Sequence, residues 1–533
     1  MMKRLGAALA SALFMVGACS PASTLAPAPA SVAPTGALAA TPSPMATPRP
    51  TPKPGPTPTV VTRALVPVTN FRAPWISVSA EEVRATADGT STRFEAIEVV
   101  ESVPAILLAM LSGITNPQLV IAPDAASLRE DLAAHPNRLG FLFADEIDPS
   151  VEALGWDDRA MFGEGRVKSL EDWPLMVVRT YLAGAVPETP AVQYDPARAW
   201  TLVAGGDIML DRGVAKTVKT EGKGIDFPFD GGTVKITSRC KDCSVFGWDL
   251  PRTQRTGDAG VVRSLVQGAD LAIFNFENPA PDAFTWHSKG TVFSADPALI
   301  EGLANAGVDW VSLANNHIRD AGAKGILQTM TSLDKWSIAH SGAGADITAA
   351  RKPALLTAGG QTVAMLGYDT IAGSYWATPS RVGSAPMTVA NLREDVAASR
   401  AAGADIVIVF PHWGTEYDAT PFAGQRALGE AAIDAGADMV IGNHAHWAAA
   451  MEVYRGKPIW YALGNFVFDQ TWSEPTMEGI TLELTFDGAR LVQIRMRPHL
   501  ILDKSQPNFM DPAGSGAVVM DQVWKASKGL LGW

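Results

Sequence analysis

The chain has 533 residues, which is long enough for two or more domains that each bury a core. Its composition is that of a globular protein, and its formal net charge is -12. This acidic excess argues against nucleic acid as the main partner, because polyanions are bound by basic surfaces.

The N-terminus has the pattern of a secretory signal. Two basic residues precede an apolar run over residues 5–16, which is shorter than the ~20 residues that span a membrane. Small residues lead directly to Cys19 in the sequence VGAC, which resembles the lipobox of bacterial lipoproteins. A plain signal peptide would also have small residues before its cleavage site. We predict a lipoprotein signal peptide over residues 1–19, lipidation of Cys19, and an extracytoplasmic protein anchored to the membrane of the cell envelope.

Two regions follow the signal. Residues 20–62 consist almost entirely of Pro, Ala, Thr and Ser, which predicts an extended linker with polyproline character. Residues 63–196 alternate apolar runs with helical segments, which predicts a smaller N-terminal α/β domain. Part of this domain resembles a lobe of periplasmic binding proteins, but it has no cluster of catalytic residue types, and we favour a structural or docking role. Its strands are expected at 65–68, 119–122 and 139–143, and its helices at 80–87 and 125–134.

A repeated pattern begins near residue 200, in a second domain that we predict over residues 197–505. Each repeat is an apolar strand with a polar tip, and helices are expected at 323–336 and 424–435. Parallel strands would bring their tips to one edge, where open α/β folds bind ligands. The strands are expected at 201–204, 271–274, 310–313, 406–410 and 439–441.

The pattern becomes β-rich after Met451. Strands at 457–463, 479–486 and 490–497 could form a second sheet. Residues 506–533 are predicted as a C-terminal tail.

The tips carry half of the histidines in the chain. Of eight histidines, four lie at strand ends: His317, His412, His444 and His446. In an extended loop the last two would face the same way, and neutral imidazole is the commonest protein ligand for a transition metal. Taken alone, this pair could equally be two surface histidines, but the gathering of histidines at strand ends favours a metal site.

Six motifs of this region carry a family resemblance. In order, they are GGDIMLDR, NFEN, LANNH, PHWGTEY, GNHAH and YALGNFVFD. They resemble the motifs of the CapA-type capsule-synthesis family, which includes poly-γ-glutamate biosynthesis proteins and is itself similar to the calcineurin-like metallophosphoesterases. The resemblance covers about residues 200–500. It implies a four-layer αββα metallophosphoesterase-like sandwich, preceded here by the smaller α/β domain.

The same resemblance implies a metal site and a proton donor. His317 corresponds to the histidine that can donate a proton. The implied cofactor is one or two divalent ions such as Mn, Fe, Zn or Mg, because hard oxygens mixed with imidazoles suit these metals. The implied ligands are Asp207, Glu277, Asn316, His412, His444 and His446.

Met209 departs from the family pattern, because it stands where the phosphoesterases have a histidine ligand. A thioether is a poor ligand for a hard divalent ion. We expect the ion held by Asp207, His446 and the shared Glu277 to be weak, absent, or completed by water or Asp211.

Other residues are weaker candidates. Arg212 could bind an anionic substrate group, although a helix-capping or ion-pair role is nearly as well supported. Glu416 and Asn465 are candidate substrate-binding residues, with orientation of His412 and a turn cap as their respective alternatives. Cys240 and Cys243 predict a local disulfide, since an exported protein favours oxidation and no second cysteine pair exists for a zinc site. His287, His340 and His499 fit no motif and are expected to be structural or exposed.

Three functional hypotheses remain open. The first is an envelope-anchored CapA-like protein with a metal site, which acts in capsule or poly-γ-glutamate synthesis or processing. Its partners would be an anionic polymer or phosphorylated envelope substrate and capsule-synthesis membrane proteins. The second is a metal-dependent phosphoesterase or related hydrolase with an extracytoplasmic substrate, and the third is a non-catalytic polymer-binding protein. The intact ligand set counts against the third, and Met209 counts against a two-metal form of the second.

Overall fold

The computed structural model describes residues 59–181, 193–371 and 373–533, all of which lie in one compact unit, residues 56–533. The predicted signal peptide, Cys19 and most of the linker lie outside the described residues. Within those residues, no helix is both long enough and apolar enough to cross a bilayer.

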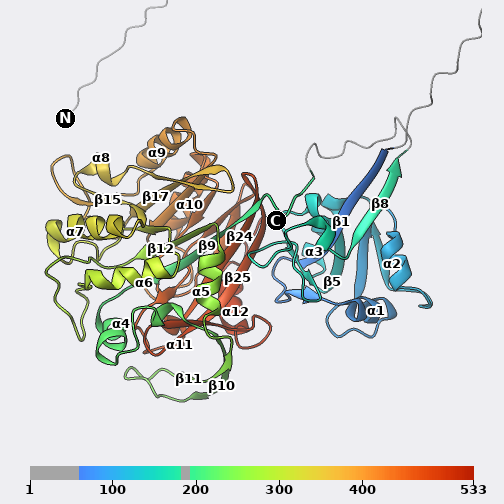
Figure 1. The fold of residues 1–533 in the computed structure, drawn as a ribbon, viewed down its shortest axis with the longest axis horizontal. Helices are drawn as coiled ribbons and strands as arrows, with labels where there is room; N and C mark the ends of the chain where they lie inside the picture. The colour runs from blue at the N-terminus through green and yellow to red at the C-terminus, as the bar shows by residue number, and fades with distance from the viewer. Residues whose placement is uncertain (1–58, 182–192, 372) are drawn as a thin grey trace, which may run out of the picture. The chain divides into compact units, whose positions relative to one another are not determined.

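The first described region is a small α/β unit (Figure 1). Its sheet has the order β4-β3-β5-β1-β6, with β3 parallel to β4 and β5, and β1 antiparallel to β5, β6 and β8. Helix α1 begins after Ser79, whose hydroxyl caps it, and α3 begins after Asp124, whose carboxylate does the same. The bounds are β1 Thr59–Asn70, α1 Ala80–Asp88, β3 Ala96–Val100, α2 Ala105–Met110, β4 Leu119–Ala122, α3 Ala125–Ala134, β5 Arg138–Phe143, β6 Val151–Ala153 and β8 Met176–Tyr181, with the short pair β2 Ser77–Val78 and β7 Gly155–Trp156 beside it.

The second region contains two larger sheets. The first has the order β11-β10-β26-β25-β24-β9-β12-β13-β14, and β23 also pairs with β9. Strands β9, β12, β13, β14 and β23 are parallel neighbours in it. The bounds are β9 Ala199–Ile208, β10 Thr233–Cys240, β11 Leu250–Gly257, β12 Leu271–Phe276, β13 Trp310–Ser312, β14 Ala339–Ser341, β23 Asn465–Val467, β24 Glu478–Asp487, β25 Arg490–Leu502 and β26 Gln506–Phe509.

The other sheet has the order β16-β17-β19-β20-β22-β21. Its centre is parallel, because β17, β19, β20 and β22 run in the same direction. The bounds are β16 Ala354–Ala358, β17 Gln361–Asp369, β19 Ile406–His412, β20 Met439–Ile441, β21 Met451–Tyr454 and β22 Lys457–Trp460, and a separate pair is formed by β15 Ala343–Gly344 and β18 Gly383–Ser384.

The side chains of the two sheets define four layers. In β9, Leu202 lies in the core shared by the two sheets, whereas Val203 faces the core under the helices of the first sheet. In β19, Ile408 lies in the shared core, whereas Val409 faces the core under the helices of the second sheet. This alternation is the period of two that a strand imposes. The fold is therefore the αββα metallophosphoesterase-like sandwich that the sequence predicted.

The outer layers are helical. Helices α5 Val261–Gly268, α6 Ile300–Asn305 and α7 Gly322–Lys335 pack on the first sheet, and α8 Ile347–Ala350, α9 Val389–Ala401 and α10 Ala423–Asp434 pack on the second (Figure 1). Short helical segments complete the chain at α4 Arg212–Ala215 and α11 Glu474–Met477.

The structure differs from the sequence prediction at three places. The strands after Met451 do not form a sheet of their own, because β21 and β22 join β20 whereas β24 and β25 join β9. Residues 506–533 are not a tail, because β26 pairs with β25 and helix α12, Ala517–Ala526, buries Val519 and Val523 in the shared core. Residues 59–62, predicted in the linker, already pair with β8.

Candidate metal centre

The predicted ligands come together at the carboxyl ends of strands from both sheets. Asp207 lies on β9, and Glu277 and Asn316 follow β12 and β13, so the first sheet supplies oxygen atoms. His412 ends β19, and the other two histidines follow β20, so the second sheet supplies nitrogen atoms. The expectation of a single sheet edge is thus corrected to two facing edges.

The potential ligand atoms form two groups that share one carboxylate. Glu277, His412 and His444 form the first group, and Asp207, Glu277 and His446 form the second. In each group one potential ligand atom per residue lies within 4.8 Å of the others. Glu277 Oε1 is 3.7 Å from Nε2 of both His412 and His446, which places it between the groups.

His412 points its Nε2 into the first group. This nitrogen lies 2.8 Å from Asn316 Oδ1 and 3.0 Å from His444 Nδ1. Asn316 thereby becomes a fourth potential ligand beside Glu277, His412 and His444. The second group contains three, with His446 Nδ1 3.4 Å from Asp207 Oδ2.

Three of the four carboxylate oxygens of the cluster are buried without a hydrogen-bond partner in the described part of the chain. Glu277 and Asp207 are fully buried, and both oxygens of Glu277 and Oδ2 of Asp207 have no hydrogen-bond partner among the described residues. Burial, followed by the nearby Asp207 charge, raises the pKa of Glu277 well above its ordinary value. Unpartnered buried carboxylates are costly, so a bound cation would stabilise this arrangement.

The histidines of the first group are suited to be neutral ligands. Burial, reinforced by the neighbouring imidazoles, lowers the pKa of His412 well below its ordinary value and that of His444 to about 3. Neutral imidazoles and carboxylates form a donor set that fits Mn, Fe or Zn, so the residues present fit the implied divalent ion.

Asparagine side chains form a second layer of contacts around the potential metal ligands. Asn275 Nδ2 donates to Asp207 Oδ1 at 2.7 Å and lies 3.3 Å from His412 Nδ1. Asn315 in turn donates to the carbonyl of Phe276 at 2.9 Å. Such contacts fix the orientation of a ligand and raise its affinity for metal. The sequence showed Asn275 beside Glu277 on one strand but did not reveal this function.

Asn465 belongs to the same supporting layer, which corrects its prediction as a substrate-binding residue. It is fully buried, and its Oδ1 lies 2.8 Å from His446 Nδ1 while its Nδ2 donates to Gln470 and to the carbonyl of Thr476. The Nδ1–H tautomer of His446 leaves Nε2 free to face Glu277. His499, also fully buried, lies behind Asn465 with Nε2 2.8 Å from its carbonyl oxygen.

His317 lies at the edge of the cluster in the position of an acid or base. Its Nδ1 is 2.9 Å from Asp320 Oδ2, and its Nε2 is 4.0 Å from Glu277 Oε1. Its ring packs on Phe293 with centroids 4.1 Å apart. Asp320 therefore orients the imidazole, a function that the sequence prediction did not assign, and proton donation by His317 stays a prediction.

The loop that carries two of the histidines is conformationally strained. His444 and His446 have φ values of 93° and 56°, in the region that favours glycine. Gly442 beside them allows close packing, because a Cβ there would lie 2.3 Å from the carbonyl oxygen of Tyr461. Strain of this kind collects at functional sites, where the surrounding fold maintains it.

Met209 and Asp211 do not complete the second group. Met209 is fully buried, and its sulfur accepts the Asp211 amide at 3.0 Å. The carboxylate of Asp211 accepts from the amides of Arg212, His287 and Ser294 and lies 2.6 Å from His287 Nδ1. Because these partners occupy Asp211, it is not available as the additional ligand considered from the sequence.

The remaining candidates lie around the rim. Arg212 pairs with Asp469 and donates to the carbonyl of Gly290 at 2.6 Å, so the ion-pair alternative describes its contacts. Glu416 is exposed on the loop after β19, and its charge contributes to the raised pKa of Glu277. Substrate binding by either side chain stays a prediction.

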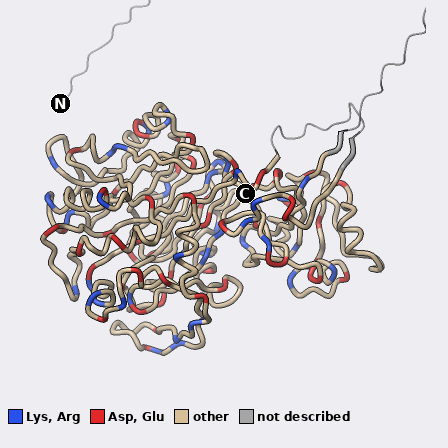
Figure 2. Tube along the Cα trace, viewed as in Figure 1, with Lys and Arg blue, Asp and Glu red and all other residues tan. Residues whose placement is uncertain are grey.

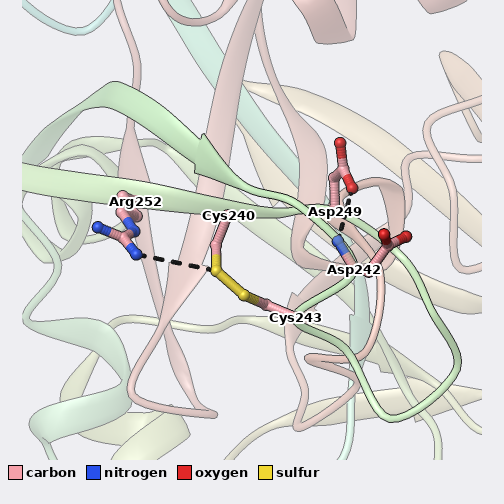
Figure 3. The surroundings of a disulfide bond; sticks show 5 residues. All are labelled: Cys240, Asp242, Cys243, Asp249 and Arg252. Atoms are coloured by element: carbon pink, nitrogen blue, oxygen red, sulfur yellow. Dashed lines mark hydrogen bonds between the residues drawn. A yellow bond between two sulfur atoms is a disulfide. The ribbon is translucent and has the colours of Figure 1, made fainter.

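Cys240 and Cys243 are paired in a disulfide at the end of β10 (Figure 3). Within this loop Asp249 accepts the backbone amide of Asp242 at 2.9 Å. The bridge lies at the tip of the β10–β11 hairpin, and it is the local disulfide that the sequence predicted.

A four-layer α/β sandwich with two facing sheets is a metallophosphoesterase-like fold, and in this chain carboxylates, an amide and imidazoles gather at its strand ends. More specifically, residues 201–470 match the model of the family described as bacterial capsule synthesis protein PGA_cap. The chain belongs to this family.

Three curated relatives agree with this assignment. The chain is 33% identical to the capsule biosynthesis protein CapA of Bacillus anthracis over 40% of this chain and 54% of that protein. It is 30% identical to the PGA biosynthesis protein CapA of Bacillus subtilis, over 54% and 68%. It is 31% identical to a probable polyglutamine synthesis accessory protein of Mycobacterium tuberculosis, over 50% and 74%. The match therefore spans about half of the Bacillus anthracis protein.

Proposed function

We propose that this protein is a metal-dependent hydrolase that acts on an extracytoplasmic substrate during capsule or poly-γ-glutamate synthesis. The observation that carries the proposal is Glu277, a fully buried carboxylate without a hydrogen-bond partner among the described residues, which lies between two groups of potential ligands. Family membership supports the biological setting. The substrate would be an anionic polymer or a phosphorylated envelope compound.

The residues of the site would have three functions: binding the metal, orienting the metal ligands and transferring a proton. Glu277, Asn316, His412 and His444 would hold the better-formed ion, and Asp207 and His446 would complete a weaker position with Glu277. A divalent ion bound there supplies Lewis acidity toward a phosphoryl or carbonyl oxygen. Asn275 and Asn465 fix the orientations of Asp207 and His446 through hydrogen bonds.

His317 would carry the proton. Asp320 fixes the imidazole at Nδ1, so Nε2 faces the cluster and can protonate the leaving group, which is the oxygen of a phosphodiester or the nitrogen of a γ-glutamyl amide. Phe293 packs against one face of the ring and helps to hold it in place.

The test separates metal binding from chemistry. Purified wild-type protein should contain a divalent metal by inductively coupled plasma analysis and should hydrolyse a member of a phosphodiester and γ-glutamyl substrate panel. His317→Ala should retain the metal and lose the hydrolysis. A wild-type protein that takes up no manganese, iron or zinc would refute the metal site and favour the non-catalytic polymer-binding alternative.

We further propose that lipidation at Cys19 tethers the protein to the cell envelope, with residues 20–58 as a spacer. The lipobox-like sequence supports this proposal. Cys19→Ser should release the protein from the membrane fraction or leave it unprocessed. A variant that fractionates and migrates like the wild type would exclude lipid anchoring.

A further inference from the structure

A series of aromatic rings extends outward from the metal cluster. Tyr417 is stacked on the metal-ligand candidate His446, with ring centroids 6.0 Å apart and planes at 27°. Its ring also lies 6.1 Å from Trp472 and 6.5 Å from Trp447. The series continues into the β10–β11 hairpin, and we call the following five residues the aromatic wall: Phe246, Trp248, Tyr417, Trp447 and Trp472.

The hairpin supplies the outer part of the wall. Phe246 contacts Trp472 edge to face at 6.2 Å, and Trp248 contacts Trp447 in the same way at 6.4 Å. Phe246 is 70% exposed, Trp248 44% and Tyr417 37%. Large aromatic side chains that remain exposed beside a buried polar site are typical of a ligand-binding surface.

The backbone holds these rings in place. Tyr417 has a φ of 62°, which is unusual for a bulky residue, and its amide donates to the carbonyl of Ala445 in the histidine loop at 2.8 Å. Arg239, at the end of β10, forms two 2.6 Å hydrogen bonds to Glu474, two residues after Trp472. Together with the adjacent disulfide, these contacts make the wall a preformed surface.

The charges beside Tyr417 restrict what the wall can bind. Glu416 and Asp418 flank it, both are exposed, and residues 412–422 contain no lysine or arginine. The hairpin that carries Phe246 and Trp248 adds Asp242 and Asp249 beside Arg239, Lys241 and Arg252, and Arg239 is paired with Glu474. Acidic residues around the wall therefore outnumber basic ones. Acidic and basic residues are interspersed along the rest of the described chain (Figure 2). Carboxylates repel polyanions and anionic membranes, whereas they accept hydrogen bonds from hydroxyl groups.

We propose that the aromatic wall binds the sugar rings of a neutral glycan segment, so that a hydrolysable group of the same chain reaches the metal centre. The apolar face of a pyranose ring stacks on aromatic rings, and its hydroxyls donate to Glu416 and Asp418. The inference rests on the proposed function for the reaction itself, and it specifies a ring-bearing polymer rather than polyglutamate as the part held by the wall.

The experiment uses the full protein and probes of known composition. Chitohexaose, cellohexaose and maltohexaose are titrated by calorimetry and tryptophan fluorescence, alongside poly-γ-glutamate and phosphatidylglycerol vesicles. At least one hexasaccharide should bind saturably. Tyr417→Ala and the double variant Phe246→Ala/Trp248→Ala should each weaken that binding about tenfold, because each removes ring contacts.

Two variants control for folding and for location. Tyr417→Phe keeps the ring and should bind within about twofold of wild type, which separates stacking from a general disturbance of the loop. Phe284→Ala changes another exposed aromatic residue, 38% exposed and outside the wall, and should leave sugar binding unchanged. All variants are compared by circular dichroism and thermal unfolding.

The outcomes separate this inference from the proposed function. Sugar binding that persists in Glu277→Gln supports the wall even if metal binding and hydrolysis fail. Absence of hexasaccharide binding at millimolar concentration, or sugar binding that the wall variants do not weaken, overturns the inference and leaves the metal site intact. Binding of polyglutamate or vesicles that the wall variants abolish also overturns it.

Discussion

Replacing Glu277 by glutamine tests the central feature of the site, because the change removes a charge and keeps the shape. In the metal-free protein the buried Glu277 has a pKa raised well above its ordinary value of 4.5. The stability that its protonated form contributes is therefore present below about pH 4.5 and is lost as pH rises through the folded-state pKa. The free energies of unfolding of metal-free wild type and Glu277→Gln should be similar at about pH 4.5 and below. As pH rises above this range, the wild type should lose stability and the variant should become the more stable of the two.

Metal reverses this order. An ion at 100 times its dissociation constant stabilises the folded wild type by about 2.7 kcal/mol. Glu277→Gln should lose most of this gain, because Glu277 is the residue that both ligand groups share. For a chain of this size the gain corresponds to an increase in Tm of roughly 2–3 °C.

The assay is thermal unfolding with and without added manganese or zinc, together with metal analysis after dialysis. Glu478→Gln is the matched control, since Glu478 is also buried, also has a raised pKa and also has one oxygen without a partner among the described residues, but it belongs to neither ligand group. The control should keep the metal-dependent increase in Tm. The reasoning is refuted if Glu277→Gln retains metal and gains the same Tm increase as wild type.

Three further predictions follow from the geometry. His412→Ala should lower metal content more than Asp207→Ala, because His412 belongs to the position with four potential ligands and Asp207 to the position with three. Equal losses of metal, measured by inductively coupled plasma analysis, would contradict this. Thiol labelling under denaturing, non-reducing conditions should find neither Cys240 nor Cys243, and quantitative labelling of both would exclude the disulfide. Burial lowers the pKa of His499 from 6.5 to about 4, so its stability contribution is lost as pH falls through that range, at up to about 1.4 kcal/mol per pH unit. Urea unfolding from pH 7 to 4.5 should show a flatter profile for His499→Gln, and parallel profiles would contradict this.

The secondary structure was predictable where its signals are local. The helix at 125–134 was predicted with the bounds that the structure gives, and in the structure the side chain of Asp124 caps its first turn. The strand at 439–441 was also predicted with correct bounds, since glycine and asparagine directly follow its apolar run. The assignment of strands to sheets was not predictable in this way, because β24 pairs with a strand more than 250 residues earlier and no local signal encodes such a partner.

The candidate site was predictable only in its inner residues. The ligand types stand at strand tips, where sequence alone marks them, and the structure brings them together. Asn275, Asp320 and Asn465 orient those ligands through contacts that depend on strand register and loop path. Asn465 illustrates the difference: its motif placed it near the site, but only the pairing of β23 with β9 shows that it lies behind His446.

The division of ligands between the sheets has a physical consequence. Oxygen ligands come from the first sheet and imidazoles from the second, so a single bound ion must draw on both sheets. The first sheet satisfies these carboxylates only in part: Asn275 donates to Asp207 Oδ1, whereas Asp207 Oδ2 and both oxygens of Glu277 have no hydrogen-bond partner among the described residues. The free energy of ion binding therefore also stabilises the contact between the edges of the two sheets. We expect removal of the ion to increase the mobility of the strained histidine loop before it affects the core shared by the sheets. The ligands divided in this way are Asp207, Glu277 and Asn316 on the first sheet and His412, His444 and His446 on the second.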